Sequence, residues 1–198
     1  MNFLAHIYLS GNNKKVTIGN FIADGIKGKK YQNYSAQIQK GILLHRAIDS
    51  YTDAHPVFKI STKRLHKRYS HFSGVIVDIF YDHFLAKNWD KYSEIQLEDY
   101  ISDFYKNLEQ HKEILPPRVL QMMPYLINDN WLLSYASIEG INKVLEGMNR
   151  RTNNVGKINN AITELEEFYS EFEYEFTEFF GDVIKFSEQK LKEITLQF

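Results

Sequence analysis

Apolar residues recur along most of this chain at spacings of three and four, the pattern of amphipathic helices. Strict alternation of apolar and polar residues, which would predict strands, is rare. Only four Pro and ten Gly interrupt the pattern in 198 residues. The sequence therefore predicts an all-α fold, a single-domain helical bundle over residues 1–198, with no sheet to support a Rossmann or P-loop site.

The apolar stripes also place individual helices. Pro56 suits the first turn of one helix, because proline lacks the N–H that a helix start leaves unpaired. Ser73 is a candidate N-cap for the next helix, and Gly181 is a possible break in the last. The predicted helices begin after Thr17 and then cover residues 35–51, 56–70, 73–88, 97–108, 119–123, 138–150 and 157–195.

Several acids and imidazoles lie inside apolar helices. His45 and Asp49 are four residues apart and share one helix face. Asp78 and Asp82 repeat that spacing in a nearly apolar run, and Asp24 follows another apolar segment. A carboxylate in such surroundings is costly unless a cation or a strong donor meets it. We therefore expect these five side chains to be the ligand pool of one divalent metal ion in the core of the bundle.

The composition narrows the choice of ion. The chain contains no Cys, which excludes a disulfide scaffold, a thiolate zinc site and a Cys nucleophile. Carboxylates with imidazoles favour Mn²⁺ or Mg²⁺ over structural zinc. Such an ion would polarise a phosphoryl oxygen and lower the pKa of a bound water. The alternative at each position is an ordinary buried residue, such as a satisfied core His or an Asp paired with a neighbouring Arg.

Four further residues are candidates for catalysis. His83 and His6 lie in apolar segments, and imidazole is the usual general acid near neutral pH. Arg46 suits a phosphate clamp through its bidentate fork, or alternatively an ion pair with a nearby Asp. Asn20 is a candidate for orienting a water or a phosphate oxygen.

Charge is unevenly distributed. Residues 27–68 carry ten Lys or Arg and two acids, although the formal net charge of the chain is −1. A basic surface beside a pocket would attract an acidic partner, and an ordinary solvated helix face is the alternative. The overall charge does not favour nucleic acid, and no apolar run is long enough for a membrane span. We expect a soluble, cytoplasmic protein with these candidate partner-binding residues: Lys27, Lys29, Lys30, Lys63, Arg64, Lys67 and Arg68.

Four motifs occur in order along the chain: MNFLAH at residues 1–6, GNFIAD at 19–24, GILLHRAIDSYTD at 41–53 and DIFYDHFL at 78–85. Together with Trp89 and Trp131 they resemble the acyl carrier protein phosphodiesterase family, which is similar to the helical HD-domain phosphohydrolases. The resemblance implies hydrolysis of the phosphodiester that joins 4′-phosphopantetheine to a serine of holo-acyl carrier protein. It also implies Mn²⁺ as the usual cofactor.

The chain departs from these families at two places. It has no His-Asp dipeptide, and Asp82-His83 stands in the reverse order, so the ligands of HD enzymes do not transfer one by one. Tyr8 stands where some family members have a second His. Two alternatives therefore remain. One is an HD-type phosphohydrolase acting on a nucleotide or other small phosphoester. The other is a non-enzymatic helical module that binds an acidic partner through residues 27–68.

Overall fold

Eleven α-helices and several short 3₁₀ turns make up the computed structural model, which describes residues 1–198 and contains no strand. The predicted all-α fold is confirmed. None of the helices combines the length and apolar character needed to cross a membrane. The α-helices are α1 (Phe3–Tyr8), α2 (Lys14–Ile22), α3 (Ala36–Ala54), α4 (Pro56–Tyr69), α5 (Ser73–Lys87), α6 (Leu97–Gln110), α7 (Pro117–Asn128), α8 (Trp131–Ser134), α9 (Ile138–Arg151), α10 (Ile162–Glu167) and α11 (Tyr169–Thr195).

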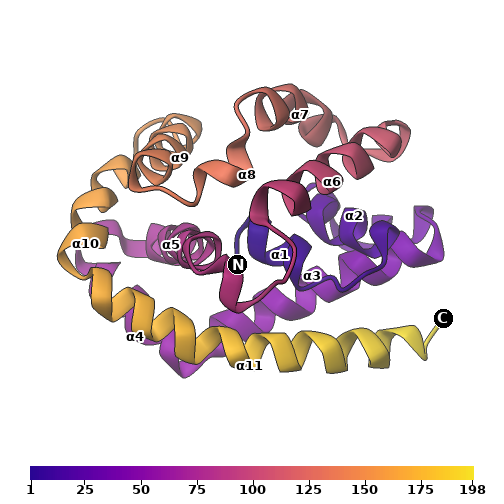
Figure 1. The fold of residues 1–198 in the computed structure, drawn as a ribbon, viewed down its shortest axis with the longest axis horizontal. Helices are drawn as coiled ribbons and strands as arrows, with labels where there is room; N and C mark the ends of the chain where they lie inside the picture. The colour runs from indigo at the N-terminus through magenta and orange to yellow at the C-terminus, as the bar shows by residue number, and fades with distance from the viewer.

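The helices surround one core of 50 buried hydrophobic residues. Figure 1 shows α11 running along one edge of the molecule beside α4, while α7, α8 and α9 follow one another along the opposite edge. The short helix α1 lies in the middle, where it packs against α2 and α5. Because α1 is central, residues close to the N-terminus come together with side chains on α3.

The helices α2 and α3 pack closely together, and two glycines make this approach possible. A Cβ atom on Gly19 would lie 2.2 Å from the backbone oxygen of Ile38, and one on Gly41 would lie 2.1 Å from that of Val16. Real Cβ atoms do not come this close to backbone, so only glycine fits at either position. The two backbones therefore touch, and this contact sets the distance between the polar side chains that the two helices carry.

Most predicted helices are confirmed within a few residues, and Pro56 is the first residue of α4. Ser73 is not an N-cap: it lies inside α5, and its hydroxyl donates to the carbonyl of Ser70. The last helices separate at Phe168 rather than at Gly181, which lies in the middle of α11. The helices α1 and α8 have six and four residues, too few to show a periodic apolar stripe.

Candidate metal centre

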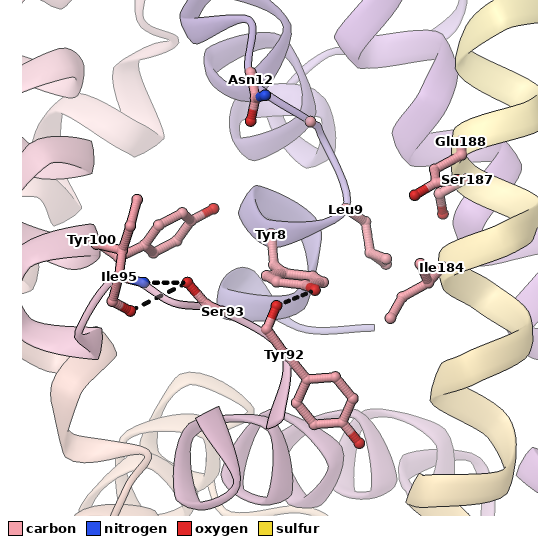
Figure 2. Close-up of a pocket in the computed structure, with 11 residues that line it drawn as sticks. Tyr8, Leu9, Asn12, Tyr92, Ser93, Ile95, Tyr100, Ile184, Ser187 and Glu188 are labelled. Atoms are coloured by element: carbon pink, nitrogen blue, oxygen red, sulfur yellow. Dashed lines mark hydrogen bonds between the residues drawn. The ribbon is translucent and has the colours of Figure 1, made fainter. Parts of the chain in front are cut away.

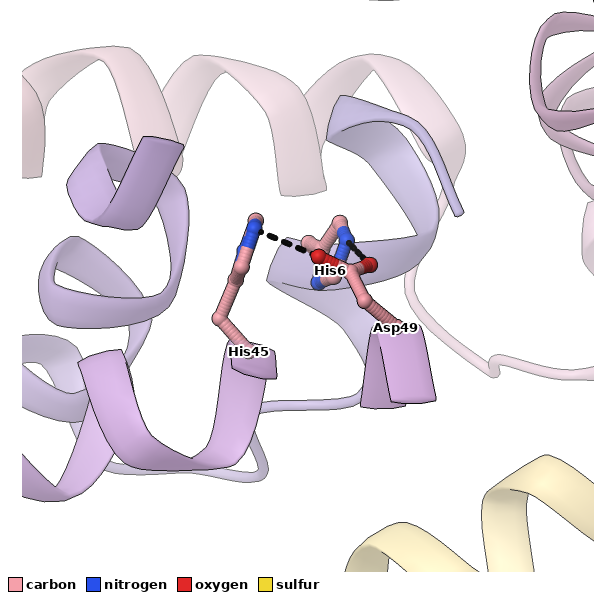
Figure 3. A group of neighbouring side chains, drawn as sticks. All are labelled: His6, His45 and Asp49. Carbon is pink, nitrogen blue, oxygen red and sulfur yellow. Dashed lines mark hydrogen bonds and ion pairs between the residues drawn. The ribbon is translucent and has the colours of Figure 1, made fainter. Parts of the chain in front are cut away.

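Three side chains from two helices, α1 and α3, point toward one another (Figure 3). His6 comes from α1, and His45 and Asp49 come from α3. One potential ligand atom from each lies within 4.8 Å of the others. The Nε2 atom of His6 is 3.1 Å from Oδ1 of Asp49, and the Nε2 atom of His45 is 3.0 Å from Oδ2 of Asp49. The two imidazole rings stack with centroids 3.9 Å apart, so both Nε2 atoms face the same carboxylate.

Asp24 joins this group from the 3₁₀ turn that follows α2. Its Oδ1 atom is 3.2 Å from Nε2 of His45. The Asp24 side chain is 65% exposed and that of Asp49 is 40% exposed, whereas both imidazoles are buried. The cluster is therefore closed by protein on the histidine side and open to solvent on the carboxylate side.

Asn20 holds His45 in one orientation. Its Oδ1 atom accepts a hydrogen bond from Nδ1 of His45 at 3.2 Å, while its Nδ2 atom donates to the His6 carbonyl and to the Ser10 hydroxyl, each at 2.9 Å. The amide is oriented by these two donations, so Nδ1 of His45 must carry the proton. Its Nε2 atom is then directed at the two carboxylates, as in many histidine metal ligands. Asn20, a candidate for orienting water, instead positions an imidazole.

Asp82 fixes the position of α1. Its two carboxylate oxygens accept the backbone N–H groups of Leu4, at 2.7 Å, and Ala5, at 3.1 Å. These are N–H groups in the first turn of α1, which have no partner within the helix. Burial raises the pKa of Asp82 to about 7, because these two hydrogen bonds only partly offset desolvation. Asp82 was expected in the ligand pool, but the structure engages its oxygens with α1 and so holds His6 in place.

Asp78 lies next to the cluster without joining it. Its Oδ1 atom is 2.9 Å from the α-amino nitrogen of Met1, and that nitrogen is 3.7 Å from Oδ1 of Asp49. Burial raises the pKa of Asp78, and the ammonium group opposes this shift. An ammonium group therefore separates Asp78 from Asp49, contrary to the expectation that both aspartates meet one ion directly.

Two further candidates contact groups outside the cluster. Nδ1 of His83 contacts the Tyr135 carbonyl at 2.7 Å, and its Nε2 contacts the Tyr169 hydroxyl at 2.8 Å. Both ring nitrogens are engaged away from the cluster, so His83 does not fit the role of general acid. Arg46 was expected to clamp phosphate or pair with an aspartate. It instead donates to the carbonyls of Ile26 and Gly28, both at 2.9 Å, and thereby holds the loop that follows Asp24.

The basic residues divide into two groups. On α4, Arg64 forms a bidentate ion pair with Glu175, with distances of 2.6 and 2.7 Å, and Arg68 pairs with Glu164. These acids come from α11 and α10, so the charges of both arginines are neutralised within the protein. The exposed lysines of the predicted set are Lys63 and Lys67 on α4, and Lys27, Lys29 and Lys30 in the segment directly after Asp24.

The electrostatics of the cluster suit a divalent cation. Burial and the positive charge on His45 lower the pKa of His6 to about 4, so this imidazole is neutral at pH 7. Burial disfavours the charged form of His45, but hydrogen bonds to Asp24 and Asp49 outweigh it and raise the pKa of His45 to about 9. The same contacts hold the pKa of Asp49 well below its usual range despite burial. Nδ1 of His6 is buried without a hydrogen-bond partner.

This donor set fits a metal ion. Two imidazole nitrogens and carboxylate oxygens are ligands that Mn²⁺ and related divalent ions accept. In the metal-free protein, a proton on His45 neutralises part of the carboxylate charge. A cation at the same place would replace that proton and balance the negative charge of both carboxylates.

Metal binding is therefore expected to release about one proton at pH 7. His45 is protonated below its pKa of about 9, so the apparent affinity should rise about tenfold per pH unit between pH 6 and 9. His6 is already neutral in that range and contributes no further slope. Calorimetric titration with Mn²⁺ in two buffers of different ionisation enthalpy measures the released proton. Equal heats in both buffers would contradict this prediction.

A separate pocket of about 300 Å³ lies between α11, the turn after α1 and the loop before α6 (Figure 2). Tyr8 lines it, and the Tyr8 hydroxyl donates to the carbonyl of Tyr92 at 2.8 Å. None of the cluster residues lines this pocket. Tyr8, which stands where some family members have a His, is therefore not placed to act as a metal ligand.

Comparisons with known proteins give matches that share one description. A family model described as acyl carrier protein phosphodiesterase matches residues 1–183. A protein of that name from Yersinia enterocolitica is 34% identical over 146 residues, which cover 73% of this chain and 76% of the relative. A protein with the same name from Photorhabdus laumondii is also 34% identical, covering 73% of this chain and 74% of the relative. No solved structure matches the chain.

Proposed function

Because this chain belongs to the acyl carrier protein phosphodiesterase family, we propose that it hydrolyses the phosphodiester between 4′-phosphopantetheine and a serine of holo-acyl carrier protein. The products are apo-acyl carrier protein and 4′-phosphopantetheine. The observation that carries the proposal is the convergence of His6, His45 and Asp49 within 4.8 Å, with a solvent-open carboxylate side. A phosphodiester on a protein surface can reach such an open side.

The metal ligands in this proposal are His6, His45, Asp49 and Asp24, and the ion is Mn²⁺, with Mg²⁺ as the second choice. When bound, the ion supplies a Lewis acid for the phosphoryl oxygens and lowers the pKa of a coordinated water. The protein contributes the geometry: α3 carries His45 and Asp49 one turn apart, Asn20 fixes the His45 ring, and Asp82 fixes α1 and with it His6.

Asp24 and the lysines that follow it also affect access to the cluster. Asp24 is the most exposed member of the cluster, so water reaches the reacting group from its side and can protonate the departing seryl oxygen. Lys27, Lys29 and Lys30 follow Asp24 directly and are exposed. Their charges attract an acidic protein substrate towards the open side of the cluster.

The proposal predicts a strictly metal-dependent reaction. Incubation of holo-acyl carrier protein with the enzyme and Mn²⁺ should convert it to the apo form, which intact-mass spectrometry detects as loss of the phosphopantetheine arm. A chelator should stop the conversion, because it removes the ion that would activate the attacking water, and added Mn²⁺ should restore it. Turnover of nucleotides with no change in the carrier would instead identify a small-phosphoester hydrolase.

A further inference from the structure

Three arginines face one open pocket on the edge formed by α7, α8 and α9. The pocket has a volume of about 450 Å³ and contains no acidic residue in its lining. We call it the arginine pocket. Its residues are Arg118, Gln121, Met122, Tyr125, Trp131, Gly147, Arg150 and Arg151. Figure 1 places this edge opposite α4 and α11.

The positive charge in this pocket is not neutralised within the protein. Arg118 and Arg151 take part in no ion pair, and Arg150 reaches only Glu146, at 4.0 Å. Burial and the positive charge of Arg118 lower the pKa of Arg151, so these two guanidinium groups repel each other. The arginines of α4 differ in this respect, because buried acids pair with them. An anionic ligand would remove a repulsion that the free protein retains.

Aromatic side chains line the same pocket. The Arg151 guanidinium carbon lies 5.7 Å from the centroid of the Trp131 ring, and the Tyr125 side chain is 68% exposed. Arg, Trp and Tyr are the residues that most often carry the binding energy of protein interfaces. A phosphate ion would contact the guanidinium groups alone, whereas a protein surface would also cover the exposed Tyr125 ring and the half-buried Trp131 and Met122.

Two contacts connect the arginine pocket with the candidate metal centre. Trp131 packs edge-on against Phe3, with ring centroids 6.0 Å apart, and Phe3 lies one turn before His6 on α1. Pro116, which directly precedes α7, approaches Gly25 so closely that a Cβ atom there would be 3.1 Å from the proline ring. Gly25 follows Asp24 in the chain. The start of α7 therefore lies beside the Asp24–Gly25 turn, and Trp131 lies beside α1, so the helices that line the pocket adjoin two segments that supply cluster residues.

We propose that the arginine pocket is a docking surface for carboxylate side chains on the surface of the acidic carrier protein, and that this contact orients the modified serine towards the candidate metal centre. This inference rests on the proposed function. Guanidinium forks pair with carboxylates through two parallel hydrogen bonds, which would fix the orientation of the partner. Lys27, Lys29 and Lys30 follow Asp24 in the chain and add further exposed positive charge.

The test measures binding of apo-acyl carrier protein, which lacks the scissile bond, so that docking is separated from hydrolysis. For the Arg118→Glu/Arg151→Glu double variant we expect the Kd, measured by calorimetry, to rise about tenfold or more, since truncating or reversing interfacial charges has effects of this size. Mn²⁺ binding should stay unchanged, because neither arginine touches the cluster. The milder Arg118→Gln/Arg151→Gln variant should weaken binding in the same direction.

The matched control is Lys185→Glu/Lys192→Glu, which makes the same change of charge on exposed positions of α11. It should alter the Kd less than twofold. Suppose that the wild type binds the carrier protein and that both arginine variants bind it with a Kd within twofold of the wild-type value. The docking inference would then be wrong, and the proposed function would be unaffected. Failure of the wild-type protein to bind any carrier protein would overturn both.

Discussion

Replacement of Asp49 by Ala is expected to lower kcat/KM for holo-acyl carrier protein by about a thousandfold or more, because several kcal/mol of charge stabilisation at the reacting phosphoryl group depend on the bound ion. Asp49 is the one residue in contact with both imidazoles, through Oδ1 to His6 and Oδ2 to His45. Its loss removes a ligand atom and also leaves the two stacked rings without the carboxylate that holds them together.

Elemental analysis of the purified Asp49→Ala variant should show loss of bound Mn²⁺ in parallel with the loss of activity. The Asp49→Asn variant keeps the shape of the side chain and one acceptor oxygen but removes the negative charge. It should bind Mn²⁺ almost as poorly as the Asp49→Ala variant. The control is Asp53→Ala, one turn further along α3 at an exposed position with no ion pair, which should stay within threefold of the wild type. A variant at Asp49 that keeps both its metal and its activity would contradict the assigned centre.

Replacement of Gly41 by Ala is expected to unfold the protein or to lower its free energy of unfolding by about 3 kcal/mol or more, at the upper end of overpacking effects. The added Cβ would lie 2.1 Å from the Val16 backbone oxygen and 2.7 Å from the Asn20 backbone nitrogen. Backbone on both sides cannot move aside as a flexible side chain would, so α2 and α3 must separate. Any Gly41→Ala protein that folds should also bind Mn²⁺ weakly, because Asn20 would no longer reach His45.

Urea unfolding followed by circular dichroism measures this loss of stability. The matched control is Gly181→Ala in the middle of α11, where a Cβ atom meets nothing within 4 Å. That change should instead stabilise the protein, by about 0.5–1 kcal/mol, because alanine has the higher helix propensity. Equal stability of the two variants would show that the α2–α3 contact is looser than the structure indicates.

The basic residues show what the distribution of charge along a sequence can and cannot predict. The run of Lys and Arg between residues 27 and 68 is a real feature of the sequence, but two of its arginines meet Glu175 and Glu164, about a hundred residues later. The pocket that keeps unpaired arginines draws Arg118 and Arg151 from separate helices. Neither fact follows from local spacing, because ion pairing depends on which helices become neighbours.

The sequence by itself determined the helices and one half of the candidate site. Both follow from local geometry: an apolar stripe at spacings of three and four is helical wherever it occurs, and residues four apart, such as His45 and Asp49, share a helix face whatever the rest of the chain does. The family resemblance was equally a property of ordered motifs, and the comparisons confirm it.

Only the tertiary structure decided which buried polar groups join that pair. Asp24 and His6 reach it from other segments. Asp82 lies in an equally apolar stretch, but it accepts hydrogen bonds from backbone N–H groups at the start of α1 instead. The sequence indicated that each such group needs a partner, because burial without one is costly. It could not say whether the partner is a cation, an ammonium group or a backbone N–H, since that depends on how α1 packs against α2 and α5.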